Sequence, residues 1–78
     1  MAQLPAVMVD VRDMTCAQAL VQADRAMRKL AVGNALEILC NAIDVRDDLV
    51  IWARELGYAL LAVDAQAGDI SLKIRRTR

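Results

Sequence analysis

The sequence predicts an α/β fold, a two-layer sandwich in which both helices lie on one face of a four-stranded mixed sheet. The predicted elements follow one another as strand, helix, strand, helix, strand, strand. Apolar residues recur at every second position in the predicted strands and at a helical period between them. The 78 residues fit one domain, residues 1–78, with an aliphatic core, since 58% are hydrophobic and only 3% are aromatic.

Composition excludes several classes of function. Ten basic and ten acidic side chains cancel, so the chain lacks the positive excess of a general nucleic-acid binder, and we expect no direct contact with tRNA. Histidine is absent, which removes the usual general base and the commonest zinc ligand. We therefore expect neither a metal site nor an organic cofactor.

The compartment follows from the cysteines and from the hydropathy pattern. Two cysteines are too few for a disulfide framework, and the first residues resemble no secretory signal. No run approaches the ~20 apolar residues of a membrane span. We expect a cytoplasmic protein with free thiols, no membrane contact and a monomeric state when no partner is bound.

The first strand is predicted from Ala6 to Arg12, where Val7, Val9 and Val11 alternate with polar or longer side chains. A capping box, Thr-x-x-Gln, then marks the start of the first helix. It is formed by Thr15 and Gln18, and it places Cys16 in the first turn. The apolar face of this helix comprises Ala19, Leu20, Ala23, Ala26, Met27 and Leu30, and Gly33-Asn34 ends the unit.

The second strand is predicted from Ala35 to Cys40, and residues 41–44 are predicted to form a loop. Asp47 and Asp48 are then expected in the first turn of the second helix, where carboxylates favour the positive end of the helix dipole. The apolar face of that helix comprises Leu49, Trp52, Ala53 and Leu56, with Trp52 in the core and Gly57 as the stop.

The third strand, from Tyr58 to Asp64, is almost continuously apolar, which favours burial on both faces or a central place in the sheet. Residues 65–69 are predicted to form a hairpin turn into the last strand, where Ile70, Leu72 and Ile74 alternate with polar residues. A right-handed first crossover makes the first two strands parallel. The loop carrying Cys16 then lies at the carboxyl edge of the sheet, where α/β proteins commonly place their sites.

Cys16 is the candidate catalytic residue. Unpaired amides and the helix dipole at a helix start both favour thiolate over thiol, and Arg12 is a candidate for further positive charge. A thiolate there could accept a sulfur atom as a persulfide and pass it on. The alternative is a structural Cys16, because free cysteine is among the most buried residue types.

The chain also resembles the TusA/SirA-like sulfur carriers over nearly its whole length. In that family a V-D-x-R-G strand precedes Cys-Pro-x-Pro and a helix, and a second helix closes on Leu-Gly. The matching residues here are Val9-Asp10-Val11-Arg12, Cys16, Leu30 to Gly33, Asp48, Trp52 to Gly57 and the final hairpin. The resemblance implies a two-layer α/β sandwich and a sulfurtransferase that relays persulfide sulfur on Cys16. It implies a protein donor, either a cysteine desulfurase or a rhodanese-like protein, and a protein acceptor.

The motif differs from the family pattern at three places. Both prolines of Cys-Pro-x-Pro are alanines, Ala17 and Ala19, and the glycine after the first strand is Asp13. An Asp-Pro pair before the second helix is replaced by residues 41–43. Proline in a first helical turn lacks only an amide that is unpaired there, so its loss is expected to leave the helix intact. Asp13 is expected to oppose thiolate formation at Cys16. These departures leave open whether the chain transfers sulfur or serves as a non-catalytic interaction module.

Four residues are supporting or partner-binding candidates beside Cys16, namely Arg12, Thr15, Gln18 and Asp48. Asp48 belongs to a charged run on the second helix, which otherwise indicates a solvated face. Cys40 has two interpretations, a core residue or a resolving thiol that forms a disulfide with Cys16.

The basic C-terminal end also has two interpretations, an edge strand protected by charge or a docking surface for an acidic partner or tRNA. Its residues are Lys73, Arg75, Arg76 and Arg78.

Overall fold

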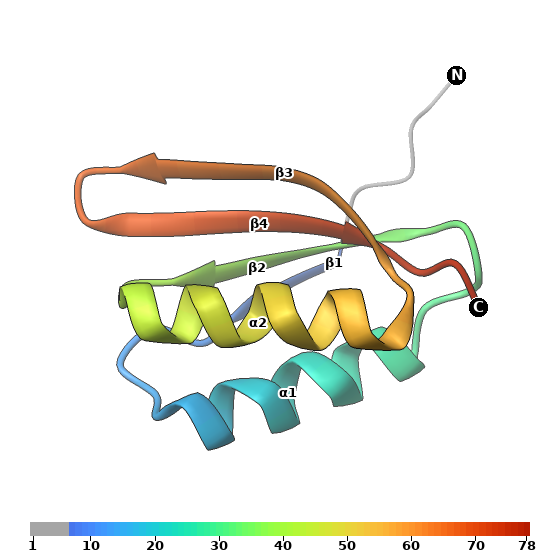
Figure 1. Cartoon of the computed structure of the whole chain (residues 1–78), viewed down its shortest axis with the longest axis horizontal. Helices are drawn as coiled ribbons and strands as arrows, with labels where there is room; N and C mark the ends of the chain where they lie inside the picture. Colours follow the sequence, from blue (N-terminus) through green and yellow to red (C-terminus); the bar gives the residue numbers. More distant parts are fainter. Residues whose placement is uncertain (1–6) are drawn as a thin grey trace.

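The computed structural model describes residues 7–78, which form a four-stranded sheet with both helices packed on one face (Figure 1). The elements are β1 (Val7–Asp10), α1 (Cys16–Arg28), β2 (Ala35–Cys40), α2 (Ile43–Leu56), β3 (Ala59–Gln66) and β4 (Asp69–Arg75). This arrangement confirms the predicted α/β two-layer sandwich and the predicted order of elements. Ala6, which the predicted first strand included, lies outside the described residues.

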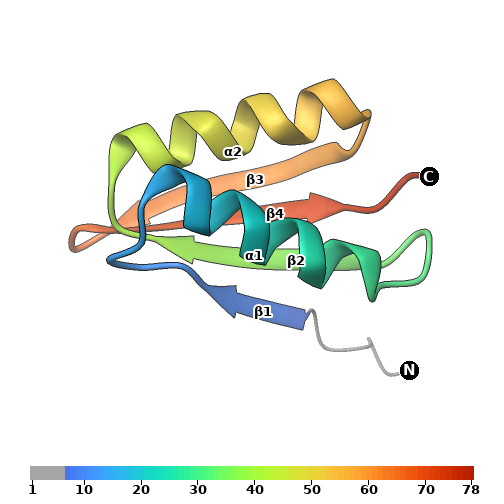
Figure 2. The ribbon, with the colours of Figure 1, turned by 90° about the horizontal axis from the view of Figure 1, so that it is seen from below.

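The sheet order is β1-β2-β4-β3. β1 and β2 are parallel, with Val9 opposite Ile38, and the other two pairs of neighbouring strands are antiparallel (Figure 2). The parallel pairing of the first two strands is confirmed. It brings the residues after β1 and after β2 to the same edge of the sheet, and both helices begin at that edge (Figure 1).

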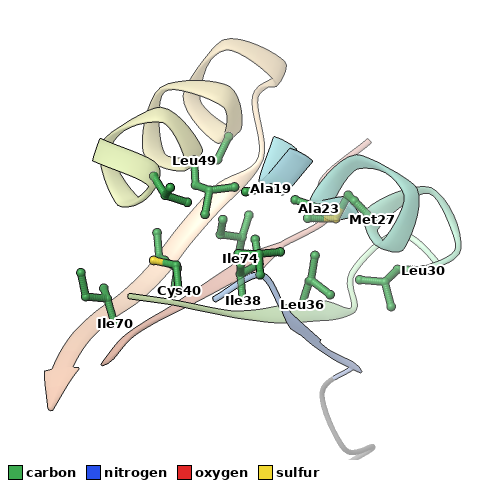
Figure 3. Packing of buried hydrophobic residues seen from close by; sticks show 14 residues of the cluster. Ala19, Ala23, Met27, Leu30, Leu36, Ile38, Cys40, Leu49, Ile70 and Ile74 are labelled. Carbon is green, nitrogen blue, oxygen red and sulfur yellow. The ribbon is translucent and has the colours of Figure 1, made fainter. Parts of the chain in front are cut away.

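The core lies between the sheet and the helices and is aliphatic apart from two sulfur-containing side chains (Figure 3). It includes the inward residues of β2, as the period of two predicted, and those of β4. The buried residues are Val11, Ala19, Ala23, Met27, Leu30, Leu36, Ile38, Cys40, Val45, Leu49, Ala53, Ile70, Leu72 and Ile74. Full burial of one Leu or Ile stabilises the fold by about 1.5–3 kcal/mol, so this cluster supplies most of the driving force for folding.

α1 begins with the predicted capping box. Thr15 Oγ1 accepts a hydrogen bond from the Gln18 amide at 3.1 Å, and Gln18 Oε1 accepts one from the Thr15 amide at 3.0 Å. Two of the amides that an α-helix leaves without partners are thereby satisfied, and Cys16 becomes the first helical residue. The buried stripe of α1 consists of Ala19, Ala23 and Met27 at helical spacing.

α2 begins earlier than predicted. It starts at Ile43, so only the first two residues of the predicted loop at 41–44 stay outside the helix. Asp44 therefore occupies the first turn, and the placement of Asp47 and Asp48 there was wrong. The N-cap, Ala42, makes no side-chain cap bond, so a sequence reading based on caps misses this start. Packing decides it, because Val45 extends the buried stripe of Leu49 and Ala53 by one turn toward the N-terminus.

β3 lies at an edge of the sheet, so its predicted central or doubly buried position was wrong. Leu60, Leu61 and Val63 are 41–45% exposed. β3 pairs with β4 through the tight hairpin, and β4 in turn pairs with β2. Within residues 7–78, one side of β3 therefore has no neighbouring strand. An apolar run indicates that a segment favours a β-strand, but it does not predict which strand of a hairpin pairs with the rest of the sheet.

The central position of β4 also changes the interpretation of the basic C-terminal end. Lys73 and Arg75 lie on the open face of a central strand, so charge protection of an edge strand was the wrong explanation for them. Trp52 is half-buried at the margin of the core instead of inside it. Its ring meets that of Tyr58 edge to face, with centroids 5.5 Å apart.

The residues after β4 cap the C-terminal ends of both helices by donating hydrogen bonds to carbonyl oxygens there. Arg76 Nη1 donates hydrogen bonds to the carbonyl oxygens of Leu30 at 2.6 Å and Arg28 at 3.2 Å, just beyond and at the end of α1. Thr77 Oγ1 donates to the Gly57 carbonyl at 2.6 Å, at the end of α2. Carbonyls at a helix C-terminus lack partners within the helix and carry partial negative charge, so the Arg76 guanidinium stabilises them on both counts.

Neither described helix has the length and hydropathy that a membrane crossing requires.

We predict that Arg76→Met lowers the free energy of unfolding by about 1–3 kcal/mol, because charge-assisted hydrogen bonds to carbonyls of α1 are lost. Urea unfolding followed by circular dichroism measures the change. Arg75→Met is the matched control, since Arg75 is exposed and its variant should stay within about 0.5 kcal/mol of the wild type. Equal losses in the two variants would contradict the capping role of Arg76.

Candidate functional site

The site lies where α1 and α2 begin, at the carboxyl edge of the β1–β2 pair (Figure 1). Cys16 is the first residue of α1 and is partly exposed. Its Sγ donates a hydrogen bond to Asp44 Oδ2 in the first turn of α2, at 3.8 Å. The sulfur is therefore accessible at the surface and contacts a carboxylate of the neighbouring helix.

The surroundings of Cys16 favour the neutral thiol, against the thiolate predicted from its position. The carboxylate of Asp48, partial burial and the negative charge of Asp44 raise the pKa of Cys16 from 9.0 to about 11. The helix start contributes on the order of 0.3–1 kcal/mol in the other direction, which two carboxylates outweigh. The expectation that the helix terminus keeps this sulfur partly ionised was wrong for the free chain.

Arg12 does not supply positive charge to the sulfur. Its guanidinium pairs with Asp10, with Nη2 2.9 Å from Oδ2, and with Asp69, with Nη1 3.2 Å from Oδ2. These contacts raise the pKa of Arg12, chiefly through the hydrogen bond with Asp10. Arg12 thus joins the end of β1 to the start of β4. Among residues 7–78 it makes no hydrogen bond or ion pair that supports its predicted role at Cys16.

Asp13 joins the two loops that lead into the helices. Its amide donates to Asn41 Oδ1 at 3.0 Å, and Asn41 Nδ2 donates to Asp13 Oδ1 at 2.9 Å. The backbone at Asp13 has φ of +63°, a left-handed conformation that glycine adopts freely and that Asp tolerates better than most residues. This conformation explains why a glycine suits the position in the resembling family, and the Asn41 pair compensates for its replacement here.

Cys40 is fully buried in the core between β2 and the helices (Figure 3). Both cysteines are free thiols. The core interpretation of Cys40 is confirmed. A resolving role has no structural support, because the Cys40 side chain is enclosed in the core whereas Cys16 Sγ contacts Asp44 on the neighbouring helix.

Comparison with known proteins decides the family. The family model for the sulfurtransferase TusA matches residues 7–76. The chain belongs to the TusA sulfurtransferase family. No curated protein sequence matches this TusA family member. The crystal structure of a SirA-like protein from Desulfitobacterium hafniense is similar, with a TM-score of 0.81 and 20% identity over 92% of this chain and 99% of that one. At this identity the likeness concerns the fold.

The two alanines that replace the family's prolines have different environments in the structure. Ala17 is exposed in the first turn of α1, and no backbone hydrogen bond from its amide is present in the described structure. The amide of Ala19 donates to the Thr15 carbonyl at 2.9 Å, and its side chain is fully buried. A proline at position 17 would therefore lose no backbone hydrogen bond, whereas a proline at position 19 would lose one.

Sequence reasoning missed Asp44, the residue whose carboxylate contacts Cys16. The sequence predicts a loop at this residue because the start of α2 carries no cap signal. The usable signal was the spacing of Asp44 and Asp48, four residues apart, which puts both carboxylates on one face of a helix that begins at Ile43. Thr15 and Gln18 form the capping box and so position Cys16 through the helix start.

We predict that Ala17→Pro changes the free energy of unfolding by less than about 0.5 kcal/mol, whereas Ala19→Pro lowers it by at least about 1 kcal/mol. The difference arises because only Ala19 loses an amide hydrogen bond. Urea unfolding of the two variants beside the wild type measures it. Equal stability of the two proline variants would show that the Ala19 amide contributes nothing.

We predict that Cys16 reacts with iodoacetamide roughly tenfold more slowly in the folded chain than in the urea-unfolded chain at neutral pH, because thiolate is the reacting form. The rate should continue to rise with pH through pH 9, as a pKa of about 11 requires. Peptide-resolved mass spectrometry separates Cys16 from Cys40. A rate that reaches its plateau below pH 8 would contradict the raised pKa.

Proposed function

We propose that this TusA family member is a small sulfur carrier in which Cys16 receives persulfide sulfur from a donor protein and passes it to an acceptor protein. The observation that carries the proposal is the placement of Cys16. It is the partly exposed thiol of the described residues, at the start of α1 in a sulfurtransferase family, while Cys40 is sealed in the core. As donors we propose a cysteine desulfurase or a rhodanese-like protein, with transfer in the cytoplasm, where thiols stay reduced.

The transfer is an exchange between sulfur atoms. Cys16 Sγ, as thiolate, attacks the outer sulfur of the donor persulfide and forms a new S–S bond. The S–S bond of the donor breaks, and the donor thiolate leaves and takes up the proton that Cys16 gave up. A nucleophile of the acceptor then attacks the outer sulfur of the Cys16 persulfide, which restores the Cys16 thiol.

The backbone around Cys16 suits a sulfur that is approached from outside. The capping box fixes the first turn of α1, and the Asp13–Asn41 pair fixes the loop before it. Because these contacts lie on either side of the thiol, its position is set before a partner arrives. A preset nucleophile lowers the ordering cost of each transfer.

A second candidate is supported by the raised pKa of Cys16 and by the missing prolines. On this proposal the chain is a non-catalytic interaction module that keeps the TusA fold and has lost transfer. The thiol would then stay neutral beside Asp44 and Asp48 in every complex. The same experiment separates the two candidates.

We predict that incubation with a cysteine desulfurase and cysteine adds the mass of one sulfur atom to the wild-type chain. Cys16→Ser should gain none, and Cys40→Ala, the matched control, should gain as much as the wild type because Cys40 is buried. Intact-mass spectrometry without reductant measures the gain. A wild-type chain that gains nothing from either a desulfurase or a rhodanese-like donor would leave the interaction module as the function.

A further inference from the structure

The sulfur of Cys16 faces carboxylates that no cation of the described structure neutralises. Asp44 Oδ2 lies 3.8 Å from Sγ, and Asp48 follows one turn later on the same face of α2. The charged groups that act on the thiol belong to these two residues. Asp44 Oδ1 accepts only the Val45 amide, and neither carboxylate forms an ion pair among residues 7–78.

The cations nearest in sequence to the site are engaged elsewhere. Arg12 holds Asp10 and Asp69. Arg46, between the two carboxylates in sequence, binds Asp47, with Nη2 2.8 Å from Oδ1. The negative charge beside the sulfur is therefore uncompensated within the described chain, although the chain as a whole is neutral.

We propose that Asp44 and Asp48 are specificity-determining residues that make Cys16 react preferentially with a sulfur donor presenting positive charge beside its own sulfur. This inference rests on the proposed function and names the chemistry of the donor surface. Attack by Cys16 requires negative charge to develop on Sγ next to two carboxylates, which disfavours neutral and anionic reactants. A lysine or arginine of the donor, brought against Asp44 and Asp48, offsets that charge while the reactants meet.

The same arrangement explains how a sulfur carrier can have a thiol that reacts slowly when no donor is bound. In the absence of a donor, the carboxylates keep Cys16 protonated and limit its reaction with small oxidants and electrophiles. On docking, the cation of the donor changes the field at the sulfur, and exchange proceeds within the complex. The negative field of the two carboxylates thus slows reaction with neutral and anionic reactants, and a cationic donor cancels that field. This difference is the source of the selectivity.

Three small disulfides test this preference without any donor protein. Cystamine carries two ammonium groups, dithiodiglycolate two carboxylates, and hydroxyethyl disulfide no charge. Cys16 thiolate attacks one sulfur of the probe, the S–S bond breaks, and the released thiolate takes up a proton, leaving a mixed disulfide on Cys16. Each rate is divided by the rate of the same probe with an uncharged cysteine derivative, N-acetylcysteine amide, so that differences between the leaving thiols cancel.

We predict that the normalised rate with cystamine exceeds that with dithiodiglycolate by about tenfold or more in the wild type. In the double variant Asp44→Asn, Asp48→Asn this ratio should fall to within about threefold of unity, and the rate with hydroxyethyl disulfide should rise several-fold. Asparagine keeps the side-chain oxygen that accepts the Val45 amide, so the start of α2 is retained. The double variant Glu55→Gln, Asp64→Asn is the matched control and should keep the wild-type ratio. It also removes two negative charges, but from exposed carboxylates that form no ion pair among residues 7–78 and do not act on the thiol.

A wild-type ratio near unity, or the same change in the control as in the double variant, would overturn the proposal. Salt provides a second measurement on the unmodified chain, because screening should reduce the wild-type ratio toward unity between low salt and 1 M salt. A ratio that persists in 1 M salt would also overturn it. Failure of the desulfurase experiment leaves these outcomes unaffected, so the two proposals fail separately.

Discussion

The parallel pairing of β1 with β2 is the constraint on which the site depends. Both strands run toward the same edge of the sheet, and each is followed by a short loop and a helix on the same face (Figure 2). The starts of α1 and α2 therefore meet, although Cys16 and Asp44 are 28 residues apart in sequence. The Asp13–Asn41 pair reinforces this meeting by connecting the two loops directly.

Two opposing electrostatic effects act on the sulfur at this edge. The first turn of α1 presents backbone amides and a positive dipole end, which favour the thiolate. The first two turns of α2 present Asp44 and Asp48, which favour the thiol, and their effect is the larger one. A cysteine at a helix start is thus not reactive by position alone, because the neighbouring helix sets its ionisation.

The element order, the fold class and the start of α1 could be predicted from sequence because each has a local cause. The strict alternation of β2 and the capping box at Thr15 and Gln18 act over a few residues, and both occur as predicted. The start of α2 could not be predicted in this way. Ala42 offers no cap, and the helix begins at Ile43 because Val45 gains burial against the sheet. The edge position of β3 escaped prediction for a similar reason, since strand order depends on pairing between distant segments.

By itself the sequence determined the two periodicities, the helix start at Cys16 and the identity of the candidate nucleophile, since these depend on neighbours within one turn or one strand. Only the tertiary structure decided which groups surround that nucleophile. In the folded chain Asp44 contacts the sulfur, and Cys40 is enclosed in the core. Arg12 pairs with Asp10 and Asp69 and not with the site. The physical reason is range. Hydrogen bonds within a turn are fixed by spacing along the chain, whereas the field at a side chain is the sum over groups that packing brings within a few ångströms.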